Sequence, residues 1–384
     1  MTLRERYLAT LLHQRPDRVP FEPGYGRAST LAAWHTQGLP PEITDYHAYA
    51  RTLLGIPHPT LTTKWLSPGI DSRMIPQFQE KILERRPAPK GASGPGSLIV
   101  QDWKGNICEI SDQYDVTYLR NAIDFVTRSW IKCPVESRAD WQAMQSRYNP
   151  ADSARFPADW PARTRQLAAR DYPSTLVFNG PFWQLREWLG FENLCMAFLD
   201  DPAFVQEMIL FWQEFIAALL EEVFASYIPD GILVCEDMAY KEKPMIGPAM
   251  AREFLLPCWR RWYELLHSAG VPIYEVDSDG HVGQLLPVFL EAGFNCNSPL
   301  EVAAGNDLPA YRQQYGTAMA YKGGVDKRAM AQGGSAIRKE IARLTPVIQA
   351  GGYIPSCDHG IPADVSWPNF LEYCKLLAQA TGWL

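Results

Sequence analysis

Five segments in the second half of the chain share one pattern, in which a short apolar run ends in a cluster of polar or ionisable residues. The segments are 231–237, 272–281, 293–301, 319–327 and 352–360. Short apolar runs of this kind are typical of strands buried on both faces in a parallel sheet covered by helices. If such a sheet closes into a barrel, the C-terminal ends of its strands meet at one rim, where enzymes of that fold hold their active sites. The pattern therefore predicts an α/β enzyme whose parallel sheet closes into a barrel.

The rest of the chain is consistent with one such barrel that carries two additions. From about residue 140, helical patterns alternate with the apolar runs, as expected for a parallel sheet with right-handed crossovers. Residues 1–14 predict an N-terminal helical extension, and Arg18–Glu22 predict a first strand. Two alternating runs flank Lys104-Gly-Asn106 and predict a β-hairpin. We expect a single domain over 1–384, with a β-hairpin excursion at about 77–120 that includes a turn-rich loop.

Composition excludes several classes of protein. The hydrophobic content of 47% and the net charge of −7, without a basic stripe, are typical of a soluble globular protein that does not bind nucleic acid. The eight cysteines form no C-x-x-C motif, so we expect reduced cysteines in a cytoplasmic protein. The N-terminus does not resemble a signal peptide, and no apolar run of about 18 residues predicts a membrane span.

Two pairs of acids end apolar runs. Asp277 and Asp279 flank Ser278, so in an extended segment their side chains point the same way. Two adjacent carboxylates repel each other unless a cation or a shared proton lies between them. Either they belong to a site, or they cap the helix expected near Gln284. Glu236 and Asp237 end another run, where they either serve the site or pair with a cation on a loop.

The last two runs add imidazole, thiol and ammonium groups. His359 suits metal binding or proton transfer near neutral pH. Cys357 is either a thiolate ligand or a small residue packed behind the loop. Lys322 and the run 326–328 either hold an anionic substrate or form ordinary ion pairs.

These motifs resemble those of the superfamily of uroporphyrinogen decarboxylase and the cobalamin-dependent methyltransferases, over nearly the whole chain. This resemblance implies a (β/α)8 TIM barrel, in agreement with the barrel expected from the strand pattern. The stretch 71–77 (Asp-Ser-Arg-Met-Ile-Pro-Gln) is similar to the Asp-x-x-x-Ile-Pro-Gln motif of the decarboxylases, which implies a catalytic acid at Asp71. The Arg-containing loop of that branch resembles Gly26-Arg27, and its Gly-His-Gly-Ile loop resembles 358–361. Its active-site Tyr falls at Trp188, its substrate-binding Ser falls at Asp237, and a second Arg has no match. The pocket is therefore less suited to a polyanion such as uroporphyrinogen.

The methyltransferase branch implies a metal site. Its zinc-binding His-x-Cys pair and its later Cys fall on Asp277-Ser-Asp279 and on His359. These donors are harder than thiolates, so they suit a Lewis-acid metal such as zinc, manganese or iron better than thiol methylation. The metal ligands expected on this basis are Glu236, Asp277, Asp279, His359 and Cys357.

The resulting hypothesis is a metal-assisted methyltransferase that moves a methyl group from a small O- or N-methyl substrate to a corrinoid on a separate partner protein. Its expected catalytic residues are Asp71, Glu236, Asp277 and His359. The residues expected to bind substrate are Arg27, Phe182, Trp183, Trp188, Asp237 and Lys322. Two alternatives remain, namely a metal-independent decarboxylase of a small carboxylated substrate and a barrel that binds a ligand without turnover. The resemblance is also compatible with a homodimer.

Overall fold

The computed structural model describes residues 1–88, 94–121 and 126–384, which form two compact units. Unit 1 comprises residues 1–69, 159–180 and 220–384. Unit 2 comprises residues 70–158 and 181–219. Part of the turn-rich loop expected in the excursion, residues 89–93, lies outside the described residues.

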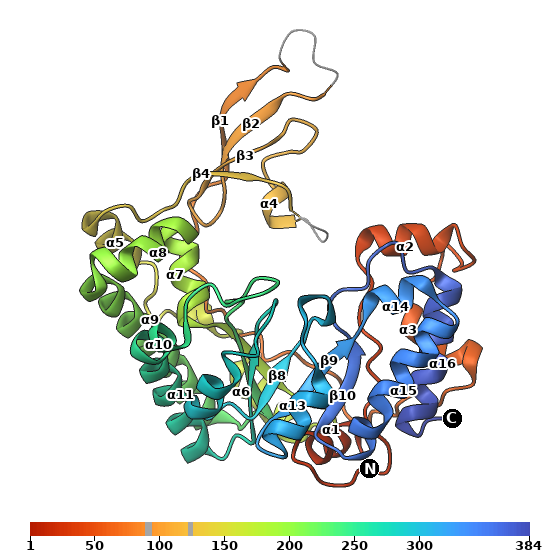
Figure 1. The fold of residues 1–384 in the computed structure, drawn as a ribbon. Helices are drawn as coiled ribbons and strands as arrows, with labels where there is room; N and C mark the ends of the chain where they lie inside the picture. Colours follow the sequence, from red (N-terminus) through yellow and green to blue (C-terminus); the bar gives the residue numbers. More distant parts are fainter. Residues whose placement is uncertain (89–93, 122–125) are drawn as a thin grey trace. The chain divides into compact units, whose positions relative to one another are not determined.

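Unit 1 contains a six-stranded parallel sheet in which strands that follow one another along the chain are neighbours, in the order β5 to β10 (Figure 1). The strands are β5 (Thr175–Asn179), β6 (Gly231–Cys235), β7 (Ile273–Asp277), β8 (Cys296–Ser298), β9 (Ala320–Val325) and β10 (Tyr353–Cys357). Each of the five predicted apolar runs supplies one of the strands β6 to β10, and each strand has polar residues at or beyond its C-terminal end. Lys322, which was expected at a strand end, instead lies within β9. The α/β architecture predicted from the alternating pattern is therefore confirmed.

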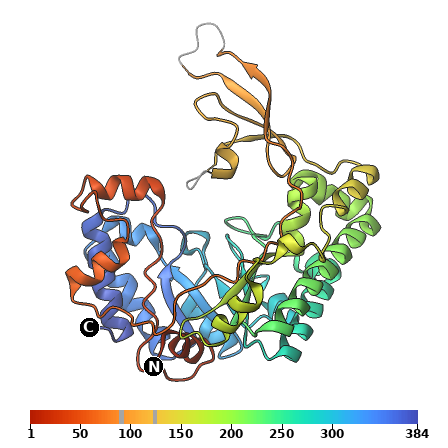
Figure 2. The ribbon, with the colours of Figure 1, turned by 180° about the vertical axis from the view of Figure 1, so that it is seen from behind.

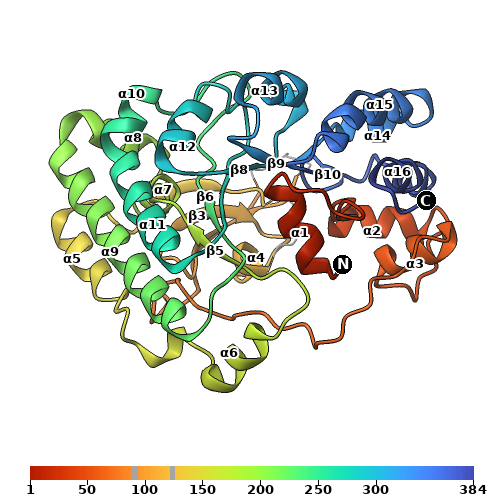
Figure 3. The same cartoon turned by 90° about the horizontal axis from the view of Figure 1, so that it is seen from below.

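Helices connect these strands and lie outside them (Figure 3). The helices of unit 1 are α1 (Leu3–Leu11), α2 (Ala28–His35), α3 (Tyr46–Leu54), α6 (Trp160–Ala168), α10 (Pro248–Met250), the π-helix η2 (Ala251–Leu255), α11 (Leu256–Ala269), α12 (Leu286–Ala292), η3 (Val302–Ala304), α13 (Leu308–Tyr315), α14 (Lys327–Gln332), α15 (Ser335–Gln349) and α16 (Trp367–Thr381).

Helix α1 closes the N-terminal end of the parallel strands. It begins at a capping box, in which the side chains of Thr2 and Glu5 each bond the backbone N–H of the other residue. Its buried Tyr7 and Leu11 pack against Ile273 and other residues near the strand starts. The predicted N-terminal helix is thus confirmed, and it is part of the core of unit 1.

The predicted strand at 18–22 is wrong. Pro20 and Pro23 have no N–H group and so cannot complete a strand ladder. Instead, the following segment runs beside the end of β10, where Ile361 N donates to Tyr25 O (2.8 Å) and Arg27 N donates to Ile361 O (3.3 Å). This pairing places Arg27 beside the C-terminal end of β10.

Unit 2 contains a four-stranded antiparallel sheet (Figure 2). Its strands are β1 (Lys81–Arg86), β2 (Ser97–Gln101), β3 (Ile107–Ser111) and β4 (Ser129–Lys132). The predicted hairpin is confirmed as β2 and β3, with Gly105 in the turn at φ +89°. The helices are α4 (Tyr118–Asn121), α5 (Arg138–Gln145), η1 (Ser153–Arg155), α7 (Pro181–Leu189), α8 (Phe191–Asp200) and α9 (Pro202–Ser226), which continues into unit 1.

Helix α9 is long and apolar enough over Pro202–Phe224 to cross a membrane by length and composition. However, 56% of its most apolar stretch is buried inside the protein. This burial is typical of a core helix of a folded domain.

Candidate active site

The inner face of the parallel sheet changes from apolar to charged along the strands. Because strand side chains alternate between faces, Glu275 and Asp277 share the face of Ile273, against which α1 packs. Glu275 is fully buried, and it accepts hydrogen bonds from Ser298 Oγ (2.7 Å) and Lys322 Nζ (3.2 Å). Burial works against the charge of Lys322, but Glu275 raises the pKa of this lysine well above its usual value. An ion pair therefore lies between helix α1 and the acids at the strand ends.

Asp277 ends β7 as a partly buried carboxyl group. Burial and then the charge of Asp279 are the largest causes that raise its pKa to about 7. Glu275 and Asp237 raise the pKa further, against partial opposition from the Lys322 ammonium. The thiol of Cys235 on β6 donates a weak hydrogen bond to Asp277 Oδ2 (3.8 Å). Near neutral pH this side chain is able to give up a proton, as a general acid must.

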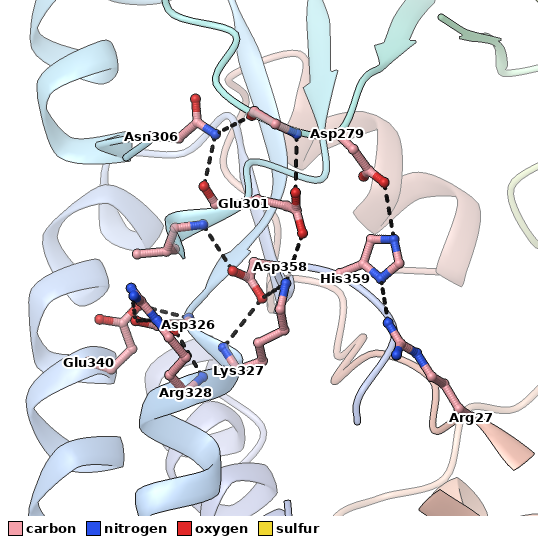
Figure 4. A network of polar contacts seen from close by, with 12 residues as sticks. Arg27, Asp279, Glu301, Asn306, Asp326, Lys327, Arg328, Glu340, Asp358 and His359 are labelled. Atoms are coloured by element: carbon pink, nitrogen blue, oxygen red, sulfur yellow. Dashed lines mark hydrogen bonds and ion pairs between the residues drawn. The ribbon is translucent and has the colours of Figure 1, made fainter. Parts of the chain in front are cut away.

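Arg27, His359 and Asp279 form a chain of side-chain contacts at the same end of the strands (Figure 4). Arg27 Nη2 lies 3.1 Å from His359 Nδ1, and His359 Nε2 lies 3.3 Å from Asp279 Oδ2. Because guanidinium groups only donate, Nδ1 must accept, and the ring proton sits on Nε2 facing Asp279. The hydrogen bond to Asp279 is the largest cause that raises the pKa of His359, and burial of the ring opposes this shift. The chain fixes the orientation and tautomer of this histidine.

Glu236 and Asp237 follow β6 but differ in their surroundings. Glu236 is fully buried, and it accepts a hydrogen bond from Trp259 Nε1 on α11 (2.6 Å). Its carboxyl group packs so closely against Gly180 that any side chain at that glycine would collide with it. Asp237 remains partly exposed in a left-handed backbone conformation (φ +45°). Of the two, Asp237 is the acid whose charge acts on Asp277.

Cys357 ends β10, where it was expected either as a thiolate ligand or as a small residue packed behind the loop. Cys357 is buried behind the loop, where Gly24 packs against its Cβ, and burial raises the pKa of its thiol to about 12. This environment favours a packed thiol over a thiolate ligand.

Tyr25 is a residue near the end of β10 that no prediction included. It is 63% exposed, and the charges of Asp277 and Asp279 both act on its hydroxyl. The only signal for it was an aromatic residue between two glycines.

The remaining predicted residues lie in unit 2. Asp71 forms a two-pronged ion pair with Arg73 (2.9 and 2.7 Å), and this pair lowers the pKa of Asp71. Phe182 and Trp188 are fully buried in α7, where Trp188 packs against other aromatic rings of unit 2. Trp183 is partly exposed beneath the Arg186 guanidinium. Their roles in catalysis or substrate binding stay predictions.

The predicted metal ligands do not fit a metal ion in this arrangement. Within residues 1–88, 94–121 and 126–384, no three His, Cys, Asp or Glu side chains gather closely enough to hold one. His359 faces a guanidinium at one nitrogen and a carboxylate at the other, and a cationic neighbour opposes metal binding. Glu236 is directed to Trp259. The metal site therefore stays a prediction.

Comparisons with known proteins agree with this architecture. The family model of uroporphyrinogen decarboxylase (URO-D) matches residues 123–378. A methyltransferase from Methanosarcina mazei superposes with a TM-score of 0.54 at 16% identity, covering 100% of this chain and 98% of that one. A B12-independent methionine synthase from Shewanella sp. W3-18-1 gives a TM-score of 0.39 at 10% identity, covering 59% of this chain and 67% of that one. No curated protein sequence matches significantly. The family match confirms the resemblance seen in the sequence, and with the parallel sheet it confirms the predicted barrel-type fold.

Proposed function

Because the chain belongs to the uroporphyrinogen decarboxylase family, we propose that it is a URO-D-like enzyme that removes a methyl group from a small O- or N-methyl substrate. One observation carries this proposal. A carboxyl group with a pKa near neutrality, Asp277, lies at the same end of the parallel strands as the chain formed by Arg27, His359 and Asp279.

Loss of a methyl group leaves negative charge on the oxygen or a lone pair on the nitrogen that carried it. Asp277 would give its proton to that atom and so assist departure of the leaving group, a role that its raised pKa supports. Arg27 and His359 would orient polar groups of the substrate. The Glu275–Lys322 pair would keep the face of the sheet between helix α1 and Asp277 charged and ordered. The methyl acceptor would be a corrinoid carried by a separate protein, which supplies the nucleophile when bound.

Methyl transfer to free cob(I)alamin tests the proposal. The protein is incubated with a panel of O-methyl and N-methyl compounds, and methylcobalamin is measured by absorbance. Asp277→Asn should lower the rate by about a hundredfold, the smaller end of the range for general acid catalysis. Glu291→Gln is the matched control, since Glu291 pairs with Arg252 on the surface of unit 1. Methyl transfer at an unchanged rate in Asp277→Asn would remove Asp277 from the mechanism.

The decarboxylase alternative is favoured by one observation, the Arg27 guanidinium at the strand ends. Arginine binds carboxylates in a two-pronged geometry, and Asp277 would then protonate the carbanion left after loss of CO2. Release of CO2 from a panel of small carboxylic acids, without any corrinoid, would support this reaction over methyl transfer. Ligand binding with neither product would support the barrel without turnover.

Several expectations about the setting of the protein stay proposals. We propose a cytoplasmic enzyme, in keeping with its eight free cysteines. We also propose a homodimer without a nucleic-acid partner. Light scattering coupled to gel filtration would measure the oligomeric state directly.

A further inference from the structure

Lys327 lies at the centre of a polar network that joins the loops after β7, β8, β9 and β10 (Figure 4). Its Nζ donates to Glu301 Oε1 (2.9 Å) and lies 3.5 Å from Asp358 Oδ1. The Asp358 side chain is fully buried, whereas those of Lys327 and Glu301 are 20% and 23% exposed. One ammonium group therefore faces two carboxylates in a largely dry environment, where unpaired charges are costly.

Glu301 and Asn306 hold the peptide that follows Asp279. Gly280 N donates to Glu301 Oε2 (3.1 Å), and Asn306 Nδ2 donates to Gly280 O (2.8 Å). Gly280 has φ +78°, and any side chain there would collide with the carbonyl group of Ala239. The backbone next to Asp279 is thus held on several sides, and the carboxylate of Glu301 links it to Lys327.

Asp358 holds the loop that carries His359. Its Oδ2 accepts from Val302 N (2.9 Å), and its Oδ1 accepts from Lys327 N (3.3 Å). The two residues that meet at 3.3 Å, Asp279 and His359, are therefore each adjacent in sequence to a residue anchored in this network.

We propose that Lys327 is a positioning residue that holds the loops after β7 and β10 in register, so that Asp279 meets Nε2 of His359. The proposal rests on the proposed function only for its importance to catalysis, since the geometry itself can be measured without a substrate. Without the ammonium group, Glu301 and Asp358 would be two neighbouring, poorly solvated carboxylates that repel each other. Their separation would draw Gly280 and His359 apart.

The sequence left open whether Lys327 binds an anionic substrate. Here Nζ has two carboxylate partners of its own, and an anionic ligand would have to compete with both. A structural role therefore accounts for this lysine better than direct substrate binding.

The test is NMR of protein labelled with 15N-histidine, in which the signal of His359 among the seven histidines is assigned with a His359→Asn variant. The wild type should show the Nε2–H tautomer with a ring proton protected from exchange. In Lys327→Met that proton should exchange at least about fivefold faster, the size expected for loss of one hydrogen bond. Lys327→Arg should restore protection, because it restores the positive charge.

Arg328→Met is the matched control, because the adjacent Arg328 pairs with Asp326 at the surface (its side chain is 57% exposed). Its His359 signal should equal that of the wild type. Unchanged protection in folded Lys327→Met overturns the proposal. If Lys327→Met does not fold, Glu301→Gln replaces it, because the amide loses the charge that binds Lys327. Unchanged protection in Glu301→Gln then overturns the proposal as well.

An activity measurement separates this proposal from the proposed function. If Lys327→Met loses protection at His359 while methyl transfer is absent even in the wild type, the positioning role stands and the proposed reaction fails. If the positioning role and the proposed reaction both hold, Lys327→Met should lower kcat by at least about fivefold with KM little changed. The substitution would misplace His359 without removing a contact between Lys327 and the substrate.

Discussion

Asp277 shows how neighbours decide the chemistry of a single side chain. Burial is the largest cause that opposes its ionisation, and three further carboxylates, those of Asp279, Glu275 and Asp237, add to this effect. Lys322, whose charge lowers the pKa of Asp277, is already paired with Glu275. The result is a carboxyl group that exchanges its proton near neutral pH, although an exposed aspartate would be ionised there.

This shift predicts a specific dependence of stability on pH. Folded Asp277 binds a proton up to about pH 7, whereas the unfolded chain releases it near the ordinary value of 3.8. The folded state therefore binds more protons between these pH values, so its stability falls as pH rises through this window. Asn at 277 stays neutral and removes this contribution. From pH 5 to pH 8, urea denaturation should show the wild type losing on the order of 2 kcal/mol more than Asp277→Asn. Equal losses would mean that Asp277 has an ordinary pKa.

Gly180 offers a second test at the level of one residue. A methyl group there would collide with the buried carboxyl group of Glu236, so Gly180→Ala should destabilise the protein by about 1–3 kcal/mol. Gly247→Ala is the control, since nothing lies near its Cβ position and its φ of −68° suits alanine. The two free energies of unfolding are compared by urea denaturation. A similar, small effect of both substitutions would show that Glu236 is free to move.

At the level of elements, the parallel strands end where charged residues begin, and α1 closes their opposite end. The strands β6 to β10 each carry a polar cluster at or beyond their C-terminal end. The segment expected to be a strand before Pro23 instead runs irregularly into pairing with the end of β10. This irregular pairing brings Arg27 to His359, and a regular strand was not needed for it.

The closing role of α1 can be tested by truncating one side chain. Leu11 is 2% exposed and packs in the cluster at the strand starts, so Leu11→Ala should cost about 2–4 kcal/mol of unfolding free energy. The neighbouring Leu12 is 36% exposed, so Leu12→Ala should stay within about 0.5 kcal/mol. Urea denaturation measures both. A small loss of unfolding free energy in Leu11→Ala would mean that the packing of this helix against the strand starts contributes little to stability.

At the level of the whole molecule, the predicted site is divided between two compact units. Unit 1 contains the acids of the strand ends together with Arg27, Lys322 and His359. Unit 2 contains Asp71 and the aromatic residues of α7. The chain passes between the units several times, so each unit is assembled from distant segments.

The arrangement in unit 1 also predicts the metal content of the protein. His359 and Glu236 are held by other partners, and no three of the described His, Cys, Asp and Glu residues gather closely enough to hold a metal ion. Protein purified and dialysed without chelator should therefore contain less than about 0.1 equivalent of zinc, manganese or iron, since a bound structural or catalytic zinc is stoichiometric. Elemental analysis by mass spectrometry measures this. One equivalent of metal, lost together with Asp279→Ala, would instead establish the metal site predicted from the sequence.

Patterns of short range were enough to predict the barrel-type fold, the β2–β3 hairpin, helix α1 and the acids at the strand ends. Apolar periodicity, turn residues and capping residues act over a few positions, so they can be recognised in the sequence without knowledge of the tertiary structure. The prediction of a strand failed at residues 18–22, because Pro20 within this segment and Pro23 just after it lack the N–H groups that a strand ladder needs.

The sequence by itself thus determined the class of fold and which charged residues end its strands. Only the tertiary structure decided which of them meet: His359 with Arg27 and Asp279, Lys322 with Glu275, and Glu236 with Trp259. These pairings join residues from 23 to 332 positions apart. Electrostatic interactions depend on distance and burial, and the order of residues along the chain specifies neither until the strands are packed.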